Sequence, residues 1–248
     1  MLRMPHFTRA QQRAADALAQ DLDHVFGPRL RSLVLYHGHQ GDGSVHSCAL
    51  VDDLAFRDLA ACLPYAEAWH RRGVAVPLLL SEDEFHRTID VFPLEYAGIL
   101  ADYAVARGID PFTNVRIDAE DVRRACEAQA KSHLIHLREA FLESHAETTR
   151  IGRLIVASAA PLRTLLTQIA RLSAEASAKA GTLDADSLSD EALAAMAEAR
   201  MGVSAALIKE VLASSANGHS AVTDPSHLLA RYIDAAKRIW EYVDRWHS

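Results

Sequence analysis

The sequence has few aromatic residues and no excess of basic ones. Phe, Trp and Tyr make up only 6% of the 248 residues, whereas half of the chain is apolar. This composition favours a helix-rich protein with an aliphatic core over an all-β architecture. The formal net charge is −7. A general nucleic-acid-binding function normally requires a basic surface and is therefore not expected.

Cysteines and long apolar runs are also scarce. The three cysteines, Cys48, Cys62 and Cys126, form no CxxC motif and lie far apart, so we predict buried, reduced thiols. No apolar run approaches the roughly 18 residues that a membrane span requires. The residues after Met1 lead into a charged helix without the apolar core of a signal peptide. Together these features predict a cytoplasmic protein with no membrane partner.

Strand-like and helix-like segments alternate over residues 1–117. Strands are predicted at 30–36, 45–51, 74–80 and 91–96, from short apolar runs bounded by turn residues. Helices are predicted at 8–26, at 56–72 and after the capping box that begins at Ser81. Pro64 is expected to kink or split the second of them. This order predicts a layered domain of strands and helices.

Residues 118–248 contain helical patterns alone. Four helices are predicted, beginning near Asp118, Thr148, Ser189 and Pro225. Their apolar stripes and short loops predict a helical bundle, so the whole chain is predicted to be α+β, a small mixed sheet followed by a bundle. His133 falls on an apolar stripe and is predicted to be a core histidine. The alanine-rich segment 192–206, with Trp240 and Trp246, either supplies a homodimer surface or closes the bundle.

The most informative stretch is residues 33–54. It contains an apolar strand, a glycine-rich turn dense in histidine, a second strand and a polar helix start. This is the layout of a phosphate-handling loop between two strands. Together with segments 90–96, 109–112 and 138–143, it resembles the nucleotidyltransferase superfamily. More closely, it is similar to bacterial nucleotidyltransferase-domain proteins of uncertain function.

The resemblance implies a specific site. In that superfamily a Gly-Ser pair cradles the triphosphate, an Asp-x-Asp opens the second strand, and a third carboxylate lies on a later strand. Carboxylates are needed because two Mg²⁺ ions bridge the phosphates and the attacking hydroxyl. Aligned on residues 49–54, the cradle falls at Gly38 and His39, the two acids at Ser44 and His46, and the third acid at Glu95. Glu95 is thus the one carboxylate retained and the candidate catalytic residue.

Three functions remain open at this point. The leading expectation is a catalytically degenerate nucleotidyltransferase-like protein that serves as a binding or regulatory module, with a nucleotide or a protein as its partner. The first alternative is an active Mg²⁺-dependent enzyme that transfers a nucleotide to a small-molecule or protein hydroxyl. It would need Asp42, Asp52 or Asp53 as acids in another register, although Asp52 and Asp53 are expected to cap the next helix.

The second alternative is a zinc site. His37, His39 and His46 could hold Zn²⁺ through three imidazoles and leave one position for water. The simpler interpretation is that they are three exposed loop histidines in a chain that contains 13.

Overall fold

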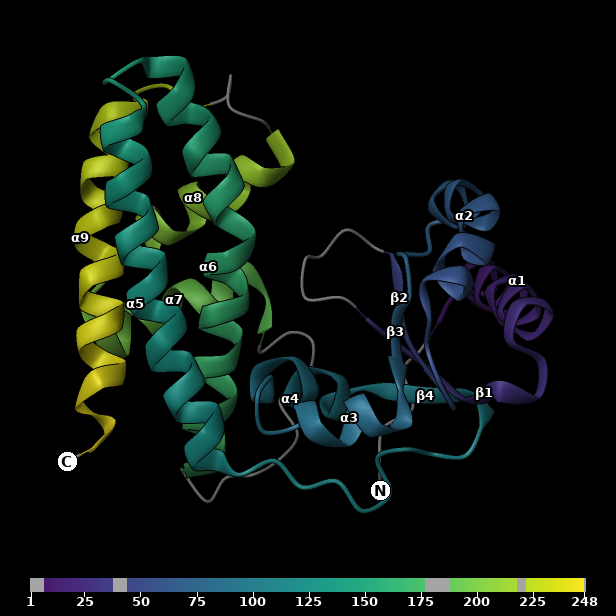
Figure 1. Ribbon diagram of the computed structural model, residues 1–248. Coiled ribbons are helices and arrows are strands. Elements are labelled where there is room, and N and C mark those ends of the chain that lie inside the picture. Colours follow the sequence, from purple (N-terminus) through teal and green to yellow (C-terminus); the bar gives the residue numbers. More distant parts are fainter. Residues whose placement is uncertain (1–6, 38–43, 177–187, 218–221, 248) are drawn as a thin grey trace. The chain divides into compact units, whose positions relative to one another are not determined.

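The computed structural model describes residues 7–37, 44–176, 188–217 and 222–247, and the chain divides into two compact units, residues 1–118 and 119–248 (Figure 1). The first unit contains a mixed sheet with helices, and the described part of the second is helical. The α+β class predicted from the sequence is therefore confirmed.

The first unit is built around a four-stranded sheet in the order β3-β2-β1-β4. Strand β1 pairs antiparallel with both β2 and β4, and β3 pairs parallel with β2. The elements in chain order are α1 (Arg9–Phe26), the 3₁₀ helix η1 (Gly27–Arg29), β1 (Leu30–His37), β2 (Val45–Val51), α2 (Phe56–Arg71), β3 (Leu78–Ser81), α3 (Glu82–Thr88), α4 (Pro93–Ala101) and β4 (Tyr103–Gly108).

Helices cover both faces of this sheet, α1 and α2 on one side and α3 and α4 on the other (Figure 1). Successive side chains of a strand point to opposite faces. Accordingly, Leu33 and Leu35 pack with α1 and α2, whereas Val34 packs with α3 and α4. Because both faces are buried, β1 and β2 read as continuous apolar runs rather than as alternating ones.

The prediction of a strand at residues 91–96 is wrong, because this segment lies mostly in helix α4. Pro93 stands in the first turn of α4. A proline is well suited to that position because its φ angle is fixed near the helical value and its missing N–H would be unpaired there anyway. The fourth strand follows instead at Tyr103–Gly108, and β3 is shorter than the predicted strand.

The second unit is a set of packed helices. Helix α5 packs against α6 and α9, which run beside it, and α8 packs against α6 (Figure 1). The helices in chain order are α5 (Ala119–Glu143), α6 (Thr148–Ala176), α7 (Asp190–Met201), α8 (Ala205–Asn217), α9 (Pro225–Asp244) and the 3₁₀ helix η4 (Arg245–His247). Pro161 lies within α6 and Pro64 within α2, and neither divides its helix.

The single helix predicted to begin near Ser189 is two helices, α7 and α8. Gly202 ends α7 in the left-handed conformation, with φ of 64°, and its N–H donates to the carbonyls of Ala197 and Glu198. Glycine adopts this conformation without the strain that a side chain brings. The helical periodicity continues beyond Gly202, so it did not reveal the break.

Three further features of the described residues bear on the predictions. All three cysteines are free and buried, as predicted. His133, predicted to be a core histidine, is partly buried, and its Nε2 lies 2.7 Å from the hydroxyl of the buried Tyr232. None of the helices in the described ranges combines the length and the apolar character that crossing a bilayer requires.

Candidate functional site

The hairpin β1–β2 places the predicted site at one end of the sheet. Tyr36 pairs with His46 and His37 pairs with Val45. Directly opposed residues share a face, and neighbours along a strand alternate. His46 and Tyr36 therefore lie on the side covered by α3 and α4, whereas His37 lies on the side covered by α1.

The two described histidines of the proposed zinc site thus belong to opposite faces of the sheet. His37 Nδ1 lies 3.2 Å from a carboxylate oxygen of Asp102, and its ring lies 4.7 Å from that of Phe7. Among the described residues, no three His, Cys, Asp or Glu side chains are grouped closely enough to hold a metal ion. His39 lies outside the described residues, as do Gly38 of the predicted cradle and Asp42.

The face around His46 is apolar and aromatic. The imidazole of His46 packs against the ring of Tyr36, with 5.7 Å between the centroids. Burial raises the pKa of Tyr36 to about 12 and the pKa of the neighbouring Cys48 thiol to about 12. Both groups are therefore neutral at physiological pH. The same face continues into a cluster of edge-to-face rings formed by Phe85, Tyr96, Tyr103 and Phe112.

Glu95 differs from the geometry that the resemblance implied. It was expected on a strand between two apolar residues, but it lies exposed in the first turn of α4. A carboxylate at that position interacts favourably with the positive end of the helix dipole, which is a structural role in itself. Ser44 immediately precedes β2.

Asp52 and Asp53, the alternative acids, are both engaged with arginines. Asp52 forms an ion pair with Arg31, and Asp53 lies 3.6 Å from Arg29. Neither caps α2. That role belongs to the buried Asp58, whose carboxylate accepts the N–H of Ala55 at 2.9 Å and the guanidinium of Arg29 at 2.6 Å. The hydrogen bond from Arg29 is the main cause that lowers the pKa of Asp58 to about 2.

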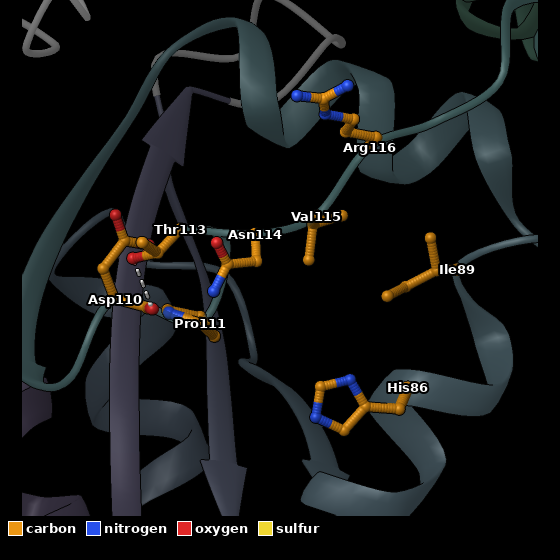
Figure 2. A pocket seen from close by; sticks show the side chains of 8 residues that line it. All are labelled: His86, Ile89, Asp110, Pro111, Thr113, Asn114, Val115 and Arg116. Atoms are coloured by element: carbon orange, nitrogen blue, oxygen red, sulfur yellow. Dashed lines mark hydrogen bonds between the residues drawn. The ribbon is translucent and has the colours of Figure 1, made fainter.

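A pocket of about 320 Å³ lies on the same side of the sheet, beside the aromatic cluster (Figure 2). Helix α3 contributes His86, and Ile89 follows at its end. The opposite wall is the segment from Asp110 to Arg116, with Thr113 and Asn114 exposed along it. Arg116 stands at one end of the pocket in Figure 2.

The segment 110–116 is fixed by hydrogen bonds and by one buried ring. The carboxylate of Asp110 accepts the hydroxyl of Tyr103 at 2.9 Å and the N–H of Phe112 at 2.9 Å. Thr113 donates to the carbonyl of Asp110, as the dashed line in Figure 2 marks. Burial, followed by the bond to Asp110, raises the pKa of Tyr103 to about 12. Phe112 is buried in the aromatic cluster and anchors the segment.

The polar lining of this pocket would suit an anionic group. Its side-chain donors are the guanidinium of Arg116, the imidazole of His86 and the amide of Asn114, whereas the Asp110 carboxylate already accepts two protein donors. Sequence reasoning did not identify it. The segment Ile109–Phe112 contributed to the family resemblance, but nothing in the sequence linked it to His86.

Comparisons with known proteins assign this chain to no family. No protein-family model matches the chain, and no curated protein matches it.

Proposed function

We propose that residues 1–118 are a nucleotidyltransferase-like module that does not perform two-metal nucleotide transfer and acts by binding a ligand. The observation behind this proposal is the chemistry of the face of β2 that holds His46. Two metal-binding acids are expected at Ser44 and His46, yet His46 packs against Tyr36 and adjoins the neutral, buried Cys48.

Mg²⁺ is coordinated by hard oxygen ligands, carboxylates above all, and an imidazole is a poor substitute. A second metal-binding acid would have to come from elsewhere in the unit. Of the candidate acids in the described part of the unit, Asp52 and Asp53 are held by Arg31 and Arg29, and Glu95 lies on a helix. These contacts favour the binding module over the active enzyme.

The ligand of the module is proposed to be a small anion, with a nucleotide phosphate as the leading candidate. Arg116, His86 and Asn114 would provide its donors, and Ile89, Pro111 and Val115 an apolar wall. Guanidinium groups recognise phosphate and carboxylate oxygens through paired N–H donors.

Isothermal titration of the full chain with ATP, with inorganic phosphate and with acetate tests the proposal. We expect ATP or phosphate to bind, and Arg116→Ala to weaken binding about tenfold or more, since it removes a charge-assisted contact. Arg87→Ala is the matched control, because Arg87 is an exposed arginine of α3 that pairs with Asp83 and does not line the pocket. No binding of any of the three anions at millimolar concentration, or equal effects of the two variants, would overturn it.

A further inference from the structure

Helix α2 has apolar residues on two opposite sides. Its inner side packs into the core of the first unit through Cys62, Tyr65 and Trp69. Its outer side exposes Phe56 and Leu63, whose exposed fractions are 83% and 71%. Single exposed apolar residues are ordinary, but a continuous row on one helix face is not.

The outer residues form such a row, which we call the α2 stripe: Phe56, Leu59, Ala60, Leu63 and Pro64. All are exposed. Positions separated by three, four, seven and eight residues lie on one face of a helix. A helix that is apolar on both sides is normally covered on both sides.

Charged side chains flank the α2 stripe in a particular order. At its N-terminal end, Asp53 precedes Phe56 and Arg57 follows it, and the two form an exposed pair with 3.9 Å between their charged atoms. After it, Glu67 and Arg71 form a second exposed pair at 3.3 Å. The N-terminal end of the stripe therefore carries an acid followed by a base, and so does its C-terminal end.

This order is complementary to itself when one helix is reversed. In an antiparallel pair centred at the level of Cys62, Arg57 of one helix stands opposite Glu67 of the other, because both are equally distant in sequence from Cys62. The acidic start of each helix then faces the basic end of its neighbour. The helix dipoles are also opposed, which is the favourable arrangement.

We propose that two copies of this chain associate through the α2 stripe, with their α2 helices antiparallel and with Arg57 of each copy facing Glu67 of the other. The contact is isologous, as in most twofold dimers, because the same patch serves both copies. It involves one helix face per copy, which is less than the ~800 Å² per partner that is usual for stable complexes. The dimer is therefore a weak one that dissociates on dilution. This inference is independent of the proposed ligand.

Sedimentation velocity of the full chain over a hundredfold range of concentration tests the interface. We expect a monomer–dimer equilibrium that Leu63→Glu shifts at least tenfold toward monomer. Leu142→Glu is the matched control: Leu142 is 73% exposed on α5, so the same charge is introduced at an equally exposed leucine outside the stripe. Circular dichroism of both variants verifies folding. A wild-type chain that is monomeric at every concentration would overturn the proposal, as would equal dissociation constants for the two variants.

A charge-reversal experiment tests the antiparallel pairing. Arg57→Glu alone, or Glu67→Arg alone, places like charges opposite each other at two symmetric positions, and each should weaken the dimer about tenfold. Mixing the two variants creates a heterodimer in which every opposed pair is again attractive. We expect the mixture to dimerise as tightly as the wild type. A mixture no tighter than its components would rule out this arrangement.

Discussion

His46 packs against Tyr36 directly across the β1–β2 hairpin, with 5.7 Å between the ring centroids. The contact occupies a position where the nucleotidyltransferase resemblance implies a metal-binding aspartate. It places an imidazole ring at the edge of a face that continues into Cys48, Phe85 and Tyr96. An aspartate at this position would have to lie beside that aromatic surface.

Replacing His46 by aspartate should therefore destabilise the first unit. We expect His46→Asp to lower the free energy of unfolding by about 1–2 kcal/mol more than His46→Asn does, because the two variants differ only by a charge on a partly buried face. Urea unfolding monitored by tryptophan fluorescence measures both. If the two variants have the same stability, the face around His46 is more polar than its contacts indicate.

Gly108 provides a second test, of the packing of β4 against β1. Its φ angle is +71°, and a Cβ placed on it would lie 1.8 Å from the carbonyl oxygen of Arg31. Gly73 has nearly the same φ angle, +72°, with no atom within 4 Å of such a Cβ. Gly73→Ala should cost about 1 kcal/mol through backbone strain alone.

Gly108→Ala should cost that amount and about 3 kcal/mol or more in addition, because strand β4 would have to move away from Arg31. Denaturant unfolding of the two variants in parallel measures the difference. Similar stabilities would mean that β4 can shift freely at this end and that Gly108 does not fix the pairing register of β4 with β1.

The second unit should show a pH dependence that comes from His133. Burial, with a smaller effect of His136, lowers the pKa of His133 to about 4. Tyr232 donates to the carbonyl of Ser158, so its oxygen accepts the Nε2–H of a neutral His133. As the pH falls, His133 of the unfolded chain takes up a proton near its ordinary pKa of about 6.5. His133 of the folded chain takes up a proton only near pH 4.

Stability from this group is thus fully present above pH 6.5 and falls as the pH drops toward 4. Between pH 7 and pH 4 we expect the free energy of unfolding of the wild type to fall by about 2 kcal/mol more than that of His133→Gln. Glutamine keeps an N–H donor and cannot be protonated in this range. Urea unfolding at intervals between pH 7 and pH 4 compares the two proteins. Parallel curves would show that His133 titrates normally in the folded state.

Local signals were sufficient to predict much of the first unit. The apolar runs at residues 30–36 and 45–51 and the capping box at Ser81 predicted β1, β2 and the start of α3. Val91–Tyr96 was misassigned because its β-branched and aromatic residues resemble a strand, while Pro93 and the burial of Tyr96 among rings from distant segments favour a helix.

The candidate site depended on contacts that no local pattern contains. His37 pairs with Asp102, which is 65 residues away in sequence. The pocket joins His86 to Arg116 because Phe112, four residues before Arg116, packs against Phe85, the neighbour of His86 on α3. Residue spacing along the chain could place His46 on a strand, but it could not reveal the pocket formed by α3 and the segment 110–116.

The most direct test of the account is nucleotide transfer by the full chain. Purified protein is incubated with α-labelled nucleoside triphosphates, Mg²⁺ or Mn²⁺, and a mixture of hydroxyl-bearing small molecules and proteins, beside Glu95→Gln and the control Glu139→Gln, an exposed helix carboxylate of α5. We expect no labelled product above the protein-free reaction for any of the three. Metal-dependent labelling by the wild type and Glu139→Gln that is lost in Glu95→Gln would contradict the proposal and identify an active nucleotidyltransferase.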